Sequence, residues 1–180
     1  MARTIGAMAS KAQVALRPEP IAAAPAEDLK SGLYREALLL IERLHRRFLD
    51  VLKAELDRLG RSDVNNVQAL IIYNIGDDEI TIGELTNRGY YLGSNVSYNV
   101  KKLGETGYIE QARCPHDKRS VRVKLSDKGQ ALRREVSALF DKHVQQLYRP
   151  DFIQPEAVSQ MNAALRRFEQ FWSGQVRFGG

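Results

Sequence analysis

The sequence has very little cysteine, with one residue, Cys114, in a chain of 180. An intrachain disulfide is therefore excluded, and this usage fits a reducing compartment. Long apolar runs are also missing, because no stretch approaches the ~20 consecutive apolar residues that a membrane-spanning helix needs. The first residues lack the compact apolar segment of a secretion signal. We therefore expect a cytoplasmic protein with no membrane partner.

Motifs for catalysis and cofactor binding are absent as well. The sequence has no Gly-rich phosphate loop, no nucleophile elbow and no carboxylate pair in a defined setting. Its three histidines, His45, His116 and His143, form no close ligand pair, although His45, His143 and Glu42 could meet if their helices pack together. We expect no enzyme activity, cofactor or metal site, and keep a metal sensor as an alternative.

Positive charge is distributed unevenly along the chain. The net charge is +5, yet residues 101–134 alone hold ten Lys or Arg against four Asp or Glu. The remainder of the chain is therefore slightly negative. Binding to nucleic-acid phosphates requires such a cluster, although a solvated basic surface would have the same composition.

Apolar periodicity divides the chain into a tail and a series of short elements. Residues 1–27 are rich in alanine and proline, lack a regular apolar period and are predicted to be a disordered tail. Helices are expected at about 33–59, 64–75, 81–89, 94–105, 126–147 and from 155 onward, and strands at 108–113 and 120–125. The expected helix caps are Ser62 and Asp63, Thr81 with Glu84, and Ser126.

This order of elements predicts a mainly α fold with a two-stranded β-wing, the winged helix-turn-helix. Residues 61–125 would form the DNA-binding region, and residues 28–60 with 126–175 a helical dimerisation region. The helix at 94–105 would enter the major groove of duplex DNA with its first turns near base edges. We expect Ser94, Asn95, Ser97 and Tyr98 to face bases there, and Lys101 and Lys102 to suit phosphates.

Several short motifs in this region resemble the MarR family of transcriptional regulators. They are IGEL at 82–85, SNVS at 94–97, GYI at 107–109, DKRS at 117–120 and LSDKG at 125–129. The resemblance covers about residues 62–133, and residues 87–99 resemble a narrower group, the LdtR-type regulators of L,D-transpeptidase genes. Many MarR members have Ser or Thr at the position of Leu92 and a basic residue at that of Tyr98, so the base preferences of relatives are not transferred.

The resemblance implies roles for the polar turn of the wing. Arg119 would enter the minor groove, and Asp117 would pair with it and fix its direction; a narrow minor groove attracts arginine. We assign Lys118 and Arg122 of the same hairpin to DNA contact as well. The alternative for the Asp117–Arg119 pair is an exposed turn with a weak ion pair.

The helical flanks indicate a homodimer. The first helix and the last two carry long apolar stripes, and the large apolar groups of this region are too many for one face of a monomer, namely Phe140, Phe152, Phe168, Phe171 and Trp172. The simplest explanation is that these side chains are buried against a second copy of the chain, although an ordinary intrachain core is the alternative. Two copies would read a pseudo-palindrome with half-sites ~34 Å apart.

Regulation by a small aromatic or phenolic effector is implied by the family resemblance. Candidate contacts, chosen by their placement, are Leu44, Phe48, Leu70, Asn74 and Leu132, which could equally be core residues. Two other functions stay open: a redox-responsive regulator that senses through Cys114, whose neighbouring cations could lower its pKa, and a winged-helix protein-interaction module. Whether DNA binding represses or activates transcription does not follow from the sequence.

Overall fold

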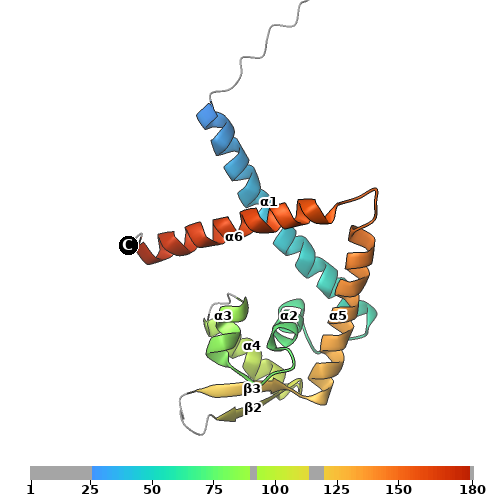
Figure 1. Ribbon diagram of the computed structural model, residues 1–180. Coiled ribbons are helices and arrows are strands. Elements are labelled where there is room, and N and C mark those ends of the chain that lie inside the picture. The colour runs from blue at the N-terminus through green and yellow to red at the C-terminus, as the bar shows by residue number, and fades with distance from the viewer. Residues whose placement is uncertain (1–25, 90–92, 114–119, 179–180) are drawn as a thin grey trace, which may run out of the picture. The chain divides into compact units, whose positions relative to one another are not determined.

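The structure, a computed structural model, describes residues 26–89, 93–113 and 120–178. The predicted tail at 1–27 therefore lies almost entirely outside the described residues. The helices are α1 (Ala26–Arg58), α2 (Asn66–Ile75), α3 (Ile82–Gly89), α4 (Gly93–Glu105), α5 (Asp127–Leu147) and α6 (Pro155–Phe178), and the strands are β1 (Ile80–Thr81), β2 (Ile109–Arg113) and β3 (Val121–Leu125) (Figure 1). The predicted mainly α winged-helix fold is confirmed. None of the described helices is long and apolar enough to cross a membrane.

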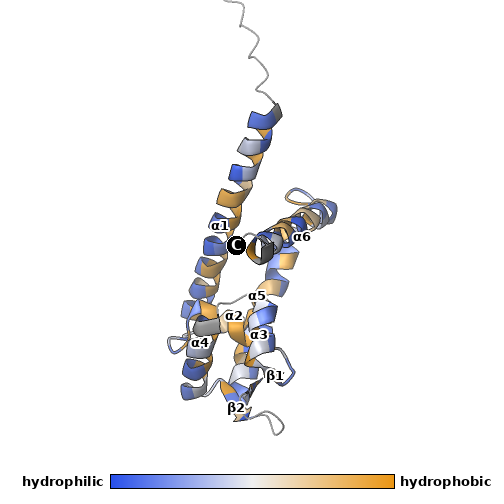
Figure 2. Cartoon of the chain, turned by 90° about the vertical axis from the view of Figure 1, so that its left-hand side faces the viewer, coloured by the Kyte–Doolittle hydropathy of each residue, from blue (hydrophilic) through white to orange (hydrophobic). Residues whose placement is uncertain are grey.

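Two compact units make up the chain, Met1–Arg43 and Leu44–Gly180. In the first unit the described residues belong to α1, along which hydrophilic and hydrophobic bands alternate (Figure 2). The second unit contains the last turns of α1 and every other helix and strand that the structure describes. Within it, α2 packs on α5 and α3, and α3 packs on α4.

The sheet has three strands rather than the two expected from the sequence. Its order is β1-β3-β2, and both pairings are antiparallel. Ile109 lies opposite Leu125 and Arg113 opposite Val121, which defines the hairpin. The strand that was missed, β1, is only two residues long, too short to show an alternating pattern.

One apolar core joins helices α2 to α5 and the sheet of the second unit. Ile71, Ile72 and Ile75 of α2 are fully buried, and Val123 reaches the same core from the middle strand. The remaining fully buried large side chains of this core are Leu52, Leu85, Val96, Val100, Leu103, Tyr108 and Leu132. Phe140 also packs on this core, with its ring 4.8 Å from that of Tyr73, so one of the aromatic residues assigned to a dimer is partly used within the chain.

Helix caps confirm two predictions and correct a third. Thr81 and Glu84 form the expected reciprocal pair at the start of α3, and the Ser126 hydroxyl accepts from the Gly129 backbone N–H. Helix α2, however, is capped by Asn65 with Gln68 and not by Ser62 or Asp63. The prediction was wrong because the Asp63 carboxylate is held by distant side chains instead.

Candidate nucleic-acid interface

Helix α4 separates a buried apolar face from an exposed polar one. Val96, Val100 and Leu103 are at most 1% exposed. The Asn99 side chain is turned back into the helix, where its Nδ2 donates to the Asn95 carbonyl oxygen at 2.8 Å. Because one face is fixed in the core, the other is presented rigidly to solvent, as a recognition helix requires.

The residues predicted to read bases lie on this outer face where the structure describes them. Asn95, Ser97 and Tyr98 are exposed, and the Tyr98 side chain is 63% exposed. Lys101 and Lys102 are also exposed and lie nearer the end of the helix. Ser94 belongs to α4, but its side chain lies outside the described residues, as do Cys114, His116 and the predicted wing-tip residues Asp117, Lys118 and Arg119.

Many cations within the basic segment at residues 101–134 are already paired with carboxylates. Lys102 bonds Glu105 at 2.8 Å, Lys124 bonds Glu110 at 2.8 Å, Lys128 bonds Asp63 and Arg133 bonds Asp77. Arg122, a predicted DNA contact, has its Nε 3.4 Å from a carboxylate oxygen of Glu79. The hydrogen bonds raise the pKa of Lys102 and of Lys124 and lower that of Glu105. Counting charges along the sequence therefore overstates the positive charge available to phosphates.

A polar cluster at the base of the hairpin joins three segments that are distant in the sequence. The buried Tyr108 hydroxyl donates to Asp63 Oδ1 at 2.8 Å, and Lys128 Nζ donates to Asp63 Oδ2 at 2.6 Å. Lys128 also lies 4.1 Å from the centre of the Tyr108 ring. Burial, followed by the hydrogen bond to Asp63, raises the pKa of Tyr108 to about 12, and Lys128 lowers the pKa of Asp63.

This cluster ties the start of α5 to the loop before α2 and to the start of the hairpin. A second tie follows along α5, where Arg61 bonds Glu135 through two hydrogen bonds of 3.1 and 2.7 Å. Gly129 allows the close approach, because a Cβ there would lie 2.1 Å from the Tyr108 carbonyl oxygen. The hairpin is therefore held firmly on α5, a role that no sequence motif assigned to Asp63 or Arg61.

The residues predicted to bind an effector differ widely in accessibility. Leu132 is fully buried in the core, so a ligand would reach it only after rearrangement of the core. Leu44 and Phe48 are exposed or nearly so, and the Phe48 ring lies 5.7 Å from that of Phe140. Leu70 and Asn74 are half-buried. The structure thus does not bring the five into one open site.

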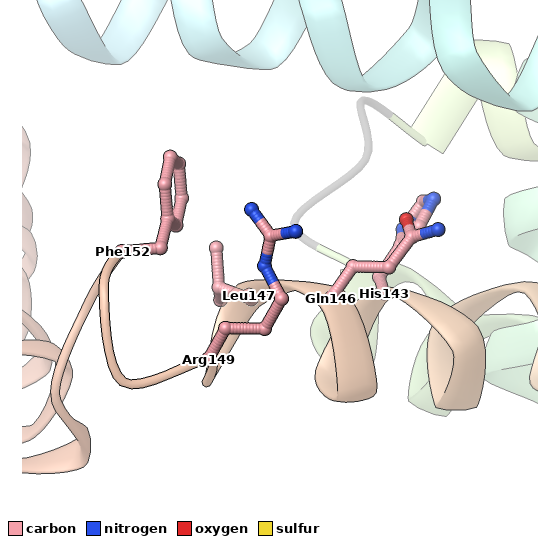
Figure 3. A pocket seen from close by; sticks show the side chains of 5 residues that line it. All are labelled: His143, Gln146, Leu147, Arg149 and Phe152. Carbon is pink, nitrogen blue, oxygen red and sulfur yellow. The ribbon is translucent and has the colours of Figure 1, made fainter.

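A hollow lies instead at the end of α5. Its volume is about 510 Å³, and its lining residues are His143, Gln146, Leu147, Arg149 and Phe152 (Figure 3). The side chains come from the last turns of α5 and the segment that follows it (Figure 3). None of the predicted effector residues is among the described residues that line it. Nor do three His, Cys, Asp or Glu side chains meet in a metal-binding arrangement anywhere in the described residues.

Comparison with known proteins agrees with this geometry. Residues 64–129 match the family described as winged helix DNA-binding domain, which spans α2 to the start of α5. The exopolysaccharide II synthesis transcriptional activator ExpG of Rhizobium meliloti (strain 1021) is 44% identical over 99 residues, which are 55% of this chain and 51% of ExpG. The chain thus spans about half the length of this curated relative.

Solved structures extend the likeness over most of the fold. A MarR variant from E. coli in complex with operator DNA has a TM-score of 0.60 at 22% identity and covers 76% of this chain and 97% of its own. A second structure is that of Bordetella bronchiseptica BpsR, whose DNA binding is regulated by 6-hydroxynicotinic acid. It has a TM-score of 0.61 at 16% identity and covers 74% of this chain and 98% of its own. The chain therefore has a winged-helix DNA-binding domain within a MarR-type fold, and the proteins it resembles include a transcriptional activator and an operator-bound MarR.

Proposed function

We propose that this chain is a transcriptional regulator of the MarR type that binds duplex DNA. The observation that carries the proposal is helix α4, whose apolar face is fully buried while Asn95, Ser97 and Tyr98 stand exposed. The hairpin β2–β3 follows at once, as in a winged helix-turn-helix. Likeness to ExpG in sequence and to operator-bound MarR in fold supports the same function.

The regulator would act as a homodimer. Apolar side chains remain exposed on the described part of the first unit, where Leu33 and Leu39 are 58% and 64% exposed. Separately, α6 exposes Phe171 at 54%. Such side chains are typical of surfaces that a second copy covers. Leu33→Glu should shift the protein toward monomer in sedimentation analysis with unchanged helical circular dichroism, and a fully dimeric variant would contradict this surface.

Random-pool DNA selection followed by binding titrations tests the proposed function. We expect a pseudo-palindromic site whose affinity falls steeply with salt. Arg119→Ala should weaken binding by about 1–3 kcal/mol, with the loss concentrated at the outer positions of the site. Salt-independent binding, or unchanged affinity of that variant at physiological salt, would contradict the proposal and favour a protein-interaction module.

Base reading and phosphate contact are separable on α4. Asn can form paired hydrogen bonds with adenine, whereas the Lys102 ammonium offers a phosphate only a point charge, which its bond to Glu105 partly offsets. Asn95→Ala should therefore relax base preference in a repeated selection, and Lys102→Ala should lower affinity for all sequences alike. The reverse result would overturn this assignment of roles.

Two finer features, an effector and a subgroup, are part of the proposal. A small aromatic effector would modulate DNA binding, as 6-hydroxynicotinic acid is described to do for BpsR. A ligand screen by thermal shift and by loss of DNA binding tests this. The LdtR-type subgroup rests on residues 87–99 alone, and a selected site found upstream of L,D-transpeptidase genes would support it.

A further inference from the structure

The outward face of the small sheet carries two cations on its middle strand. Arg122 and Lys124 are two residues apart in β3, so their side chains leave the same face. The residues that alternate with them, Val123 and Leu125, are buried in the core. The two cations are therefore on the solvent side of the wing, where a DNA backbone could approach.

Acidic residues flank this pair on both sides. On one side, Glu110 of β2 lies directly opposite Lys124 in the strand register, and its Oε2 is 2.8 Å from Lys124 Nζ. On the other side, Glu79 directly precedes β1, and its Oε1 is 3.4 Å from Arg122 Nε. The Arg122 guanidinium also donates to the Glu79 carbonyl oxygen at 3.4 Å. The four side chains together carry no net charge.

The Lys124–Glu110 pair is exposed, so a phosphate can compete for its cation, whereas Arg122 is only partly exposed and its Nε is buried. The side chains of Lys124 and Glu110 are 56% and 59% exposed, and exposed pairs of this kind hold each other weakly. A duplex phosphate that displaces a carboxylate from its cation is still repelled by the negative charge of that carboxylate, which stays nearby. Phosphate contact at this face therefore releases less free energy than contact with unpaired cations would.

We propose that Glu79 and Glu110 are internal counter-charges that keep Arg122 and Lys124 from binding DNA phosphates indiscriminately, so that binding depends on the seating of α4 and not on the wing's charge. This inference rests on the proposed DNA-binding function. Glu79 and Glu110 are thereby specificity-determining residues, although they read no base. Duplexes of arbitrary sequence gain little binding affinity from the sheet face. The difference in affinity between a selected site and any other sequence is therefore larger.

A salt titration of the full chain with two duplexes tests the inference. The duplexes have equal length; one carries the site found by random-pool selection and the other a scrambled sequence. Glu110→Gln should steepen the dependence of log affinity on log salt for the scrambled duplex by about 0.9, the value for one added phosphate contact. Between 50 and 200 mM salt this is a loss about 3.5-fold larger than that of the wild type. Affinity for the scrambled duplex should rise more than affinity for the selected one.

Asp57→Asn is the matched control, because it removes one carboxylate that bonds Lys53 at 2.8 Å on α1. It changes the net charge equally and should leave the salt slope near that of the wild type. The double variant Glu110→Gln with Lys124→Gln should return the slope to the wild-type value, since the released cation is gone. Glu79→Gln should act in the same direction through Arg122.

The outcomes separate the two proposals. If the wild type binds neither duplex in a salt-dependent way, the proposed function fails and the inference falls with it. If the wild type binds DNA but Glu110→Gln and Glu79→Gln both behave like Asp57→Asn, only the inference is overturned. A slope that stays steep in the double variant would also overturn it, because Lys124 would then not be the cation released.

Discussion

Helix α4 and the described part of α1 in the first unit are both amphipathic, yet their apolar faces end up in opposite situations. On α4, Val96 and Leu103 are completely buried. On α1, Leu29 and Leu33, which lie one turn apart on one face, keep more than half of their surface exposed. Both segments show helical periodicity in the sequence, so periodicity predicts which residues share a face but not what covers that face.

The difference separates an apolar face that is covered within the chain from one that is left uncovered among the described residues. The apolar face of α4 is closed by α3, β2 and the rest of the core, and this fixes the direction of its polar face. The exposed face of α1 has no such cover among the described residues of its unit. Substitutions on the two faces should therefore change different observables, stability in one case and assembly in the other.

The largest expected effect is on the core side of this comparison. Leu103→Ala removes a fully buried side chain and should lower the free energy of unfolding by about 2–5 kcal/mol. Leu33→Ala, the same change at an exposed position, should leave unfolding of the isolated chain nearly unchanged. Urea denaturation at a protein concentration that favours monomer measures both, and equal losses would remove the distinction.

A second test compares two glycines that lie close to the start of the hairpin, Gly104 on α4 and Gly129 on α5. A Cβ on Gly129 would lie 2.1 Å from the backbone oxygen of Tyr108, whereas one on Gly104 would meet only the end of the flexible Gln111 side chain at 2.6 Å. Gly129→Ala should therefore destabilise the fold by about 1–3 kcal/mol, because the hairpin must move away from α5. Gly104→Ala should be close to neutral in the same thermal unfolding assay, and a similar loss in both variants would argue against a tight contact at Gly129.

The sequence predicted those features that depend on near neighbours. Most helices were placed within a few residues, although α1 begins at Ala26 and not at the expected residue 33. The capping pairs Thr81–Glu84 and Ser126–Gly129 involve residues only three apart. The LSDKG motif also has a physical reason, since its glycine meets the Tyr108 carbonyl oxygen. Local periodicity and capping chemistry are sufficient for such features.

Features that depend on distant residues could not be predicted. Asp63 has the chemistry of a helix cap, but Tyr108 and Lys128, far along the chain, bind its carboxylate instead. Glu79 lies 43 residues from Arg122, so its pairing with that predicted DNA contact leaves no trace in local sequence. For the same reason the sequence predicted which residues form the proposed interface, but not which of their charges are neutralised by neighbouring carboxylates.

A smaller effect should come from the polar cluster at the base of the hairpin. The hydrogen bond from Lys128 and the one from Tyr108 hold the pKa of Asp63 below its usual value of 3.8. Asp63→Asn should cost about 1 kcal/mol of stability at neutral pH, a figure kept low because the side chain is partly exposed. A carboxylate with a lowered folded pKa stabilises above its unfolded pKa and loses that contribution as pH falls through the folded one. The gap between wild type and variant in chemical denaturation should therefore close below about pH 3.8; a gap that persisted there would mean that shape, not charge, is responsible.

The smallest effect is expected at the exposed pair of Lys53 and Asp57 on α1, whose side chains are 66% and 63% exposed. Lys53→Gln should change the free energy of unfolding by no more than about 0.5 kcal/mol, because solvent screens such pairs. Leu52, the preceding residue on the same helix, is 1% exposed, so Leu52→Ala should be several-fold more damaging. Parallel urea titrations of the two variants measure the contrast. Comparable losses of unfolding free energy in the two variants would show that the exposed face of this helix contributes to stability as much as its buried face does. Burial of a helix face would then no longer explain which residues stabilise the fold.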